Sequence, residues 1–520
     1  MKEKKAIAIL AVFVAASLVI PPVLAATTES TTTPISENEF KHFEVPVVGY
    51  SGSGDILVAG SDDDEFEPVI ETDANGNLLV AYTVQQGVFE SDVLLAKSTD
   101  GGSSWSIASP PWGDLEGLQH SPAMIYYPGG GAIVGTFADA SGGWQMFFKV
   151  PDVSDETTYD YNGWGGFEEI IASAVSYTTF EDGLKIIVTP LAGTSSGFEG
   201  TCMWAYADFE EMSGYGGSYY YDAQSRTGAY TDASNMKGFA FASNHYGFVC
   251  DAFREETGVV QPLIKWTVYE EEPDLEYTDH QFWLENGITA TDPDAVGTGN
   301  NIYVTYTAYN PAFGDYDIKC KYSHDGGASW DESMAASAQL VDETNSAIYA
   351  SGNTVFITYV KQGNLYLVKS EDGGATWGEP DQVNGEPGTV VAEPGATSIS
   401  RGGIVWVDTR NGNKDIYYAP LPCAIINVKD ISGGMGISAT ITNTGTEDAS
   451  NVDWSIELTG LIFIGKETTG TIDSLPAGGE EAIKSGLVFG IGPTTITITA
   501  GGASKTAKGF VLGPLVLGVK

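Results

Sequence analysis

The chain has 520 residues, with 69 Asp and Glu against 24 Lys and Arg, and a formal net charge of −45. This length exceeds one ordinary domain and indicates two or three, unless a repeat architecture enlarges one of them. A hydrophobic fraction of 42% excludes wholesale disorder. The charge argues against nucleic acid or an anionic membrane as the partner, because both select cationic surfaces.

The first 25 residues have the layout of a secretory signal peptide. A basic start at Lys2–Lys5 precedes the unbroken apolar run Ala6–Ile20, and small residues end the segment at Ala25. The apolar run is shorter than the ~20 residues that a membrane-spanning helix needs, although a retained N-terminal anchor is the alternative. Residues 26–40 are Thr-rich and are expected to form a flexible spacer. We therefore expect a secreted or cell-surface protein with no membrane-spanning segment after signal cleavage.

Four cysteines follow the predicted cleavage site: Cys202, Cys250, Cys320 and Cys423. An even number in an exported chain permits two disulfides, with three pairings open. Their spacings resemble no zinc motif. Buried thiols or one structural bridge are the preferred interpretation.

One eight-residue segment occurs three times. Ser98–Trp105 reads STDGGSSW, Ser323–Trp330 reads SHDGGASW and Ser370–Trp377 reads SEDGGATW. Each copy of this DGG segment follows a stretch of alternating apolar and polar residues, which is typical of a β-strand. Another apolar stretch lies one strand earlier in each case. The repeat therefore predicts a unit of two strands joined by a variable hairpin and followed by a fixed turn.

The residue types of the DGG segment suit a structural turn. Its Asp carboxylate is expected to accept hydrogen bonds from backbone N–H groups two or three residues further on. The Gly pair permits positive φ, and the Trp ring is expected to pack between neighbouring sheets. The structural residues predicted on this basis are Asp100, Trp105, Asp325, Trp330, Asp372 and Trp377.

The pattern S-x-D-G-G-x-[S/T]-W resembles the Asp-box, or BNR repeat, of sialidases and related β-propellers. In that family the box occupies the turn between the third and fourth strands of a blade, away from the catalytic face, so the resemblance implies a fold more than an activity. Weaker strand patterns complete seven units between about 60 and 420. We expect an all-β chain in which residues 41–422 form a seven-bladed propeller, with six blades as the alternative. Phe43–Val48 is expected to close the ring.

From about Ala424 the sequence changes to short alternating strands rich in Gly, Thr, Ile and Val. Turns are predicted at several places, among them Gly490–Pro493. This texture indicates a β-sandwich over residues 423–520. The segment Thr442–Val452 resembles the Ig-like, adhesion-type domains of archaeal and bacterial surface proteins, which implies a spacer, stalk or contact module.

The resemblance to sialidases also implies a particular set of catalytic residues. Members of that family hold the substrate carboxylate with three arginines and use an acidic acid/base and a Tyr–Glu pair. This chain has four arginines, Arg226, Arg254, Arg401 and Arg410, and none before position 226. Arg410 is expected to pair with Asp408 or Asp415 across a hairpin. The family's site cannot be assembled on this pattern, but convergence of the other three arginines would favour a hydrolase.

Two further motifs have ordinary interpretations. Gly193–Gly197 matches G-x-S-x-G, but a strand rather than a helix follows it, so a hairpin is expected instead of a nucleophile elbow. The run Asp62–Glu65 could attract Ca²⁺ but lacks the ligand spacing of a calcium loop, and a solvated acidic run is preferred. No other cofactor is expected.

Aromatic, Gly-rich loops at Tyr159–Phe167 and Tyr215–Asp222 are the predicted binding surface. The alternative is that these aromatics pack on their own propeller. The predicted function is non-catalytic binding or adhesion to a glycan or a surface protein. A glycoside hydrolase with an altered site and a purely structural envelope component are the other hypotheses. The candidate binding residues are Tyr159, Tyr161, Trp164, Tyr215, Tyr219, Tyr220 and Arg226.

Overall fold

A computed structural model provides the structure of the chain from residue 55 to residue 520. The predicted signal peptide, the spacer and Phe43–Val48 lie outside the described residues. Every regular element in the described part is a β-strand. Among these residues there is no helix with the length and apolar character of a transmembrane segment. Gaps in the description fall at residues 89, 111–116, 128–130, 139–143, 155–160, 166–168, 180–184, 196–197, 209–219, 222–229, 243–244, 271–275, 422–423, 425, 446–447 and 502.

The described strands up to residue 419 form seven small antiparallel sheets. The first sheet contains β2 (Asp64–Thr72), β3 (Leu78–Gly87), β4 (Glu90–Ser98) and β5 (Ser106–Ala108). The second contains β6 (Gln119–Tyr127), β7 (Gly131–Ala138), β8 (Trp144–Val150) and β9 (Tyr161–Gly165). The third contains β10 (Glu169–Ser173), β11 (Ser176–Thr179), β12 (Lys185–Ser195), β13 (Phe198–Asp208) and β14 (Tyr220–Tyr221).

The remaining sheets of this part keep the same strand order. The fourth contains β15 (Tyr230–Ala240), β16 (His245–Arg254), β17 (Val259–Glu270) and β18 (Glu276–Trp283). The fifth contains β19 (Ala290–Thr298), β20 (Asn301–Asn310), β21 (Asp315–Ser323) and β22 (Asp331–Ala336). The sixth contains β23 (Glu343–Ser351), β24 (Thr354–Lys361), β25 (Asn364–Ser370) and β26 (Asp381–Gln382). The seventh contains β27 (Thr397–Ser400), β28 (Gly403–Asp408), β29 (Asp415–Ala419) and β1 (Ile56–Ala59).

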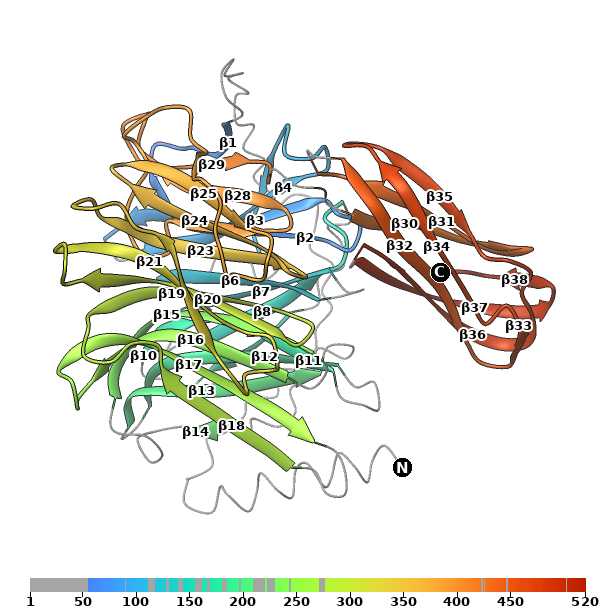
Figure 1. The fold of residues 1–520 in the computed structure, drawn as a ribbon, viewed down its shortest axis with the longest axis horizontal. Helices are drawn as coiled ribbons and strands as arrows, with labels where there is room; N and C mark the ends of the chain where they lie inside the picture. Colours follow the sequence, from blue (N-terminus) through green and yellow to red (C-terminus); the bar gives the residue numbers. More distant parts are fainter. Residues whose placement is uncertain are drawn as a thin grey trace.

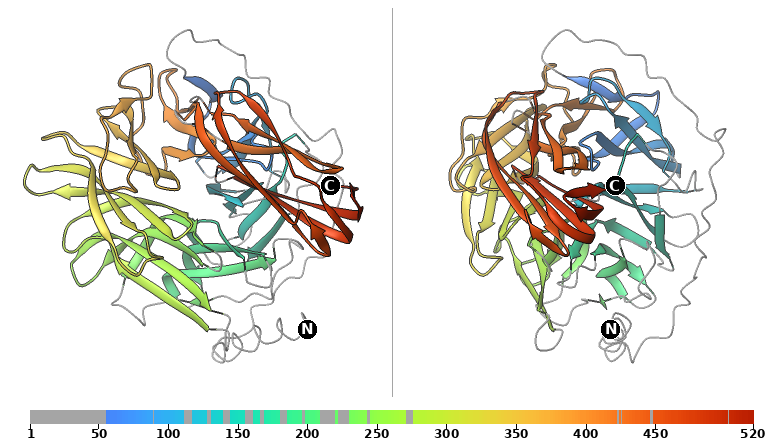
Figure 2. Two further views of the ribbon diagram at one scale, coloured as in Figure 1. Left: turned by 45° about the vertical axis from the view of Figure 1, so that its right-hand side comes forward. Right: turned by 90° about the vertical axis from the view of Figure 1, so that its right-hand side faces the viewer.

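The sheets follow one another around an axis. The first strand of each sheet contacts the first strand of the next, and β27 of the seventh sheet contacts β2 of the first. The two views in Figure 2 show this closed order of colours around the ring. Apolar side chains fill the space between neighbouring sheets, as where Leu79 and Leu95 of the first sheet meet Val134 and Phe148 of the second. This arrangement is a β-propeller, whose closure protects the sheet edges.

The ring is closed by a strand from the N-terminal side of the propeller. β1 pairs antiparallel with β29, so that Ile56 lies opposite Tyr418 and Ala59 opposite Ile416. Phe43–Val48, which the sequence predicted to close the ring, lies outside the described residues, and Ile56–Ala59 is the described strand that pairs with this edge of β29. Closure by a strand from before the first sheet is nevertheless the mechanism that the sequence suggested.

The DGG segments form turns with the same hydrogen bonds in all three copies. The Asp100 carboxylate accepts bonds from the Ser104 backbone N–H at 2.9 Å and from the Ser104 hydroxyl at 2.6 Å. The same two bonds measure 2.8 and 2.6 Å at both Asp325 and Asp372. The donor lies four residues on, not two or three as predicted, because the Ser98 hydroxyl accepts the nearer N–H, that of Gly102.

Each DGG turn joins the third strand of a sheet to the fourth, and its indole faces the preceding sheet of the ring. The turns differ in what they contact there. Trp105 packs edge-on against Tyr418 with ring centroids 5.4 Å apart, Trp330 lies 5.6 Å from Trp266, and Trp377 donates its N–H to the Ser333 hydroxyl at 2.9 Å. The turns therefore join neighbouring sheets.

Residues after 424 form two packed sheets. The smaller contains β30 (Ile426–Gly434), β31 (Gly436–Asn443) and β35 (Glu480–Lys484). The larger contains β32 (Ala449–Thr459), β33 (Ile462–Ile464), β34 (Glu467–Leu475), β36 (Phe489–Ala500), β37 (Ala503–Gly513) and β38 (Leu515–Leu517). A common core, with Ile441 and Ile483 from one sheet and Ile456 and Ile496 from the other, makes this a β-sandwich. The turn predicted at Gly490–Pro493 is wrong.

That segment belongs to β36, where Gly490 lets the chain approach β33. A Cβ on Gly490 would lie 2.5 Å from the Leu461 carbonyl oxygen, so the glycine serves close strand packing rather than a turn. Pro493 is tolerated because it faces Phe510 across the ladder while the following residues continue the pairing.

The sandwich projects from the propeller (Figure 1) and touches it at one end. The Arg401 guanidinium donates to the Asn427 side chain and lies over the Tyr126 ring, 4.3 Å from its centroid. The Lys505 ammonium donates to the Asn75 side-chain oxygen at 3.1 Å. Asn75 and Arg401 lie in turns between the first and second strands of their sheets, so the sandwich meets the propeller on the face that also carries the DGG turns.

Candidate functional site at the centre of the propeller

The two faces of the ring differ in what they carry. Because neighbouring strands are antiparallel, the hairpins between second and third strands lie at the opposite end of each sheet from the DGG turns. The connection from a fourth strand to the next sheet also leaves from this end. We call it the loop face. Within the described residues, the loop face points away from the contacts with the sandwich.

Five innermost strands carry a β-bulge near the loop face, and each bulge contains a non-glycine residue with positive φ. The register shifts there in β2, β6, β15, β19 and β23. A left-handed conformation costs such residues about 1–3 kcal/mol, and such strain concentrates at functional sites. These inner-strand bulge residues are Glu67, Ser121, Asn235, Asp292 and Asn345, with φ between 48° and 56°.

The bulge residues connect neighbouring sheets through hydrogen bonds. The Ser121 backbone N–H donates to the Glu67 carboxylate at 2.9 Å. The Asn345 side-chain amide donates to the Asp292 carboxylate at 3.1 Å, and the Thr397 hydroxyl donates to the Asn345 carbonyl at 3.1 Å. These bonds explain how the strain is offset, and they bring polar side chains of several sheets together at the ring centre.

Among the described residues, a carboxylate cluster lies between the fourth and sixth sheets. It consists of Asp251, Asp292 and Asp294. Asp251 accepts the Asp292 backbone N–H at 2.9 Å and the Asn235 side-chain amide at 2.7 Å, and Asp294 accepts the Ile348 N–H at 2.9 Å. Asp251 and Asp292 are buried.

Burial shifts the proton affinity of this cluster. Burial and the nearby Asp251 charge raise the pKa of Asp292 to about 7, while Lys237 opposes the shift. Burial also raises the pKa of Asp251 to about 6 and raises the pKa of Asp294. Perturbed carboxyl groups beside strained backbone are the physical signature of a functional site, although structural networks produce the same shifts.

Aromatic side chains also lie at the loop face of the fourth and fifth sheets, the two sheets that carry the cluster. Tyr309 and Phe313 belong to the β20–β21 hairpin and are 37% and 41% exposed. The Tyr309 backbone N–H donates to the Thr289 carbonyl at 2.9 Å, which holds this hairpin against the beginning of β19, three residues before Asp292. Trp283, at the end of β18, lies 5.3 Å below the Arg254 guanidinium. We call Trp283, Tyr309 and Phe313 the aromatic rim.

The raised pKa of Asp292 makes a prediction for stability against pH. An unfolded Asp titrates near about pH 4, so the folded protein binds the extra proton between about pH 4 and 7, and stability falls as the pH rises through this window. Asp292→Asn keeps the shape and stays neutral. We expect the variant to match the wild type at pH 5 and to exceed it at pH 8 by on the order of 2 kcal/mol. Thermal melts at the two pH values measure this. The prediction is contradicted if Asp292→Asn loses as much stability between pH 5 and pH 8 as the wild type does.

The arginines do not converge. Arg254 lies on the loop face, where it pairs with Glu256 at 2.7 Å. Arg401 lies on the opposite face, at the junction with the sandwich. Arg226 is outside the described residues. The arrangement that would favour a sialidase-like hydrolase is therefore not present among the described arginines.

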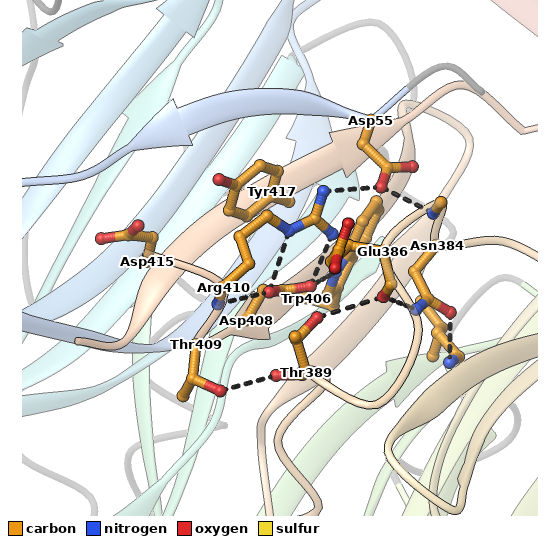
Figure 3. Close-up of polar contacts among 12 residues, drawn as sticks. Asp55, Asn384, Glu386, Thr389, Trp406, Asp408, Thr409, Arg410, Asp415 and Tyr417 are labelled. Carbon is orange, nitrogen blue, oxygen red and sulfur yellow. Dashed lines mark hydrogen bonds and ion pairs between the residues drawn. The ribbon is translucent and has the colours of Figure 1, made fainter. Parts of the chain in front are cut away.

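Arg410 is occupied by two buried carboxylates (Figure 3). Its guanidinium donates to both oxygens of Asp408, at 3.0 and 2.6 Å, and to Asp55 at 2.9 Å, and it lies over the Tyr417 ring. The predicted pairing with Asp408 is confirmed, whereas Asp415 accepts its bond from Asn411. Arg410 thus holds the segment before β1 against the last sheet and is not available to a substrate carboxylate.

The predicted aromatic binding residues fall elsewhere. Tyr159, Tyr215, Tyr219 and Arg226 lie outside the described residues. The backbones of Tyr161 and Trp164 belong to β9 and that of Tyr220 to β14. These are fourth strands at the outer edges of their sheets, so the prediction of loops is wrong at these three positions. They belong to the second and third sheets, whereas the carboxylate cluster lies on the fourth and fifth.

Two smaller predictions can be compared with the structure. Gly193–Gly197 lies where β12 and β13 pair as a hairpin up to Ser195 and Phe198, which confirms the hairpin interpretation. In Asp62–Glu65 the first three side chains are exposed, but Glu65 is buried and accepts hydrogen bonds from the Ser61 N–H and hydroxyl. The prediction of a solvated acidic run is therefore wrong at Glu65. Burial raises the pKa of Glu65 to about 7.

The described residues contain no group of three or more His, Cys, Asp or Glu side chains arranged to hold a metal ion. Cys250 and Cys320 are both buried, and Cys320 is a free thiol. The side chains of Cys202 and Cys423 lie outside the description.

No protein-family model matches the chain, and no curated protein matches it. Among solved structures, an ulvan lyase of a polysaccharide lyase family is 10% identical, with 72% of this chain and 96% of that chain covered and a TM-score of 0.42. The β-propeller domain of the Trilobed protease from Pyrococcus furiosus is 9% identical over 68% and 94%, with a TM-score of 0.37. A lectin from Burkholderia pseudomallei is 12% identical over 76% and 99%, with a TM-score of 0.37. These similarities are distant, and the propeller assignment depends on the strand order and cyclic contacts above.

Proposed function

We propose that the protein is a secreted or cell-surface binding protein. Its sialidase-like propeller has seven blades with Asp-box turns and binds a glycan on the loop face, and an Ig-like domain spaces or docks the propeller. The seven sheets and the three matching DGG turns support the first part. No cofactor is part of the proposal.

The observation that carries the binding site is the position of the aromatic rim beside the carboxylate cluster. Sugars present apolar ring faces, which pack on exposed aromatic rings, and hydroxyl groups, which hydrogen-bond to carboxylates and amides. Tyr309 and Phe313 offer the first kind of contact next to the beginning of β19. Asp292 and Asn345, which are buried and hydrogen-bond to each other, are the fixed polar groups beneath this region. Specific sites combine apolar surface with a few fixed polar groups in this way.

A glycan array followed by calorimetric titration of the strongest ligand tests the proposal. We expect the double substitution Tyr309→Ser and Phe313→Ser to weaken binding at least tenfold, because each aromatic contact contributes about 1 kcal/mol. Met334→Ser is the matched control, since Met334 is similarly exposed but lies on the outermost strand β22. Equal affinity in the double variant and the control would place the glycan elsewhere.

A glycoside hydrolase is the second candidate, favoured by the carboxyl groups of Asp251 and Asp292. A carboxyl whose pKa lies near 7 suits a general acid. Against this, both side chains are buried and occupied by neighbouring N–H groups. Turnover of any member of a panel of chromogenic glycosides, abolished by Asp292→Asn, would replace the binding proposal by this one.

A further inference from the structure

Exposed apolar side chains gather at the end of the sandwich that lies away from the propeller. They come from three strands, β36, β37 and β38, which are neighbours in the larger sheet. Ile491 pairs with Leu512, Leu512 with Leu515, and Phe510 with Leu517, so the side chains adjoin one another on one face. We call this set the apolar tip: Phe489, Ile491, Phe510, Leu512, Leu515 and Leu517, each between 39% and 53% exposed.

The apolar tip is not the core face of the sheet. In β37 and β38 the alternate residues Val511 and Val516 are buried in the sandwich core, as is Val488 just before β36. A sheet with one solvated face normally alternates apolar and polar residues. Here both faces are apolar, but only near the tip. Clusters of this kind mark a contact surface rather than scattered surface hydrophobics.

The outward side chains of β36 and β37 change along the strands from polar to apolar. Nearest the propeller, Thr499 lies opposite Ser504 and Thr497 opposite Thr506. Then Thr495 lies opposite Lys508, and beyond this pair the partners are Pro493 with Phe510 and Ile491 with Leu512. Lys508 therefore stands at the boundary, and the backbone of Lys520 pairs with it at the same level. Apolar side chains beyond a level marked by lysines are typical of a segment that dips into a lipid interface.

The distribution of charged residues also fits contact of the apolar tip with a lipid interface. Residues 486–520 contain three Lys and no Asp or Glu, in a chain with nearly three acidic residues for each basic one. On the neighbouring strands β32 and β34, Glu457 and Glu467 lie opposite each other at the level of Thr497, on the propeller side of Lys508. From Lys505, at the propeller junction, to Leu512 the strand spans about 23 Å. This exceeds a screening length of about 8–10 Å, so the acidic propeller does not repel a surface that meets the tip.

We propose that the apolar tip inserts into the surface of a lipid bilayer and attaches the protein to a membrane without a spanning segment. Phe and Leu side chains enter between the hydrocarbon chains, and Lys508 and Lys520 remain at the phosphate headgroups. The sheet edges at the tip, β33 and β38, are three residues each, so they offer little backbone for pairing with another protein chain. The proposal is independent of any glycan bound by the propeller.

Flotation with vesicles tests the proposal. The chain from Ala26, which retains every described residue, is mixed with vesicles of phosphatidylcholine or of an equimolar mixture of phosphatidylcholine and phosphatidylglycerol. We expect flotation with the mixed vesicles, and a loss of partitioning of more than about a hundredfold for the triple substitution Phe489→Ser, Phe510→Ser and Leu512→Ser. The double substitution Met334→Ser and Leu340→Ser, of exposed apolar residues on the propeller, is the control and should float as the wild type does.

Two further measurements separate lipid binding from other causes. Lys508→Gln should weaken partitioning about fivefold on the mixed vesicles and leave it unchanged on phosphatidylcholine. Because the substituted positions are exposed, we expect the thermal melts of all variants to match that of the wild type. Matching melts would show that the variants fold. Absence of flotation in the wild type overturns the proposal. So does a wild-type dimer that the triple substitution dissociates, because a second copy of the chain would then cover the apolar tip.

Discussion

Gly102→Ala is expected to destabilise the propeller by about 2–5 kcal/mol, while Gly101→Ala costs only about 1–2 kcal/mol. Both glycines of the first DGG turn have positive φ, 72° at Gly101 and 88° at Gly102, so both substitutions carry the penalty of a left-handed alanine. They differ in their surroundings. A Cβ at Gly102 would lie 2.2 Å from the Tyr418 ring, whereas a Cβ at Gly101 has nothing within 4 Å.

The clash at Gly102 cannot be relieved cheaply. Tyr418 is buried, donates its hydroxyl to the Gly402 carbonyl at 3.2 Å and supports the Trp105 ring. Chemical denaturation of the wild type and the two variants measures the difference. Equal losses in Gly101→Ala and Gly102→Ala would mean that only backbone conformation matters at this turn, and the turn would then not be a contact between sheets.

The DGG turns could be predicted because their chemistry is local. Asp100 and its bonding partners lie within the seven residues Ser98–Ser104, so the sequence pattern contains the whole hydrogen-bonded unit. The contact of Trp105 with Tyr418 joins residues more than 300 positions apart, and the sequence predicts only that the indole packs between sheets. Local chemistry thus identified the unit, and the repeat of the unit identified the ring.

The closing strand could not be located in the same way. Phe43–Val48 and Ile56–Ala59 both read as short apolar strands, and nothing local distinguishes them. The choice depends on partners near position 410: Arg410 bonds to Asp55, and the Asn413 side chain bonds to the carbonyls of Ser61 and Asp63. Such long-range contacts leave no periodic signal in the sequence.

The inner-strand bulges were missed, although the sequence contains a signal for them. Glu67, Ser121 and Asp292 are each followed by Pro inside an apolar strand pattern, and Pro within a strand indicates an edge or a bulge. Asn235 and Asn345 lack the Pro but are of a type that tolerates positive φ. The aromatic, Gly-rich pattern instead predicts Tyr161 and Trp164 as binding residues, and their backbones lie on an outer strand.

Arg410→Ala is expected to loosen ring closure and to lower the free energy of unfolding by about 3–5 kcal/mol, because it leaves two buried carboxylates without their cation. The side chains of Asp55 and Asp408 are 2% and 0% exposed. Although burial opposes it, hydrogen bonds from the Arg410 side chain hold the pKa of Asp408 below its usual value. Arg410→Lys should not restore stability, since an ammonium cannot reproduce the bidentate bond to Asp408 and the bond to Asp55 together.

The predicted loss should be local before it is global, because β1 has only four residues. Hydrogen exchange should therefore become faster at Ile56–Ala59 in Arg410→Ala, while β3 at the centre of the first sheet keeps its protection. Lys414→Ala is the matched control: Lys414 lies on the same hairpin as Arg410 and pairs at 2.6 Å with exposed Glu393, and loss of such a surface pair costs about 0–1 kcal/mol. If β1 keeps wild-type protection in Arg410→Ala, the contacts of Asn413 with Ser61 and Asp63 suffice to close the ring, and the buried ion pair is not what holds the strand.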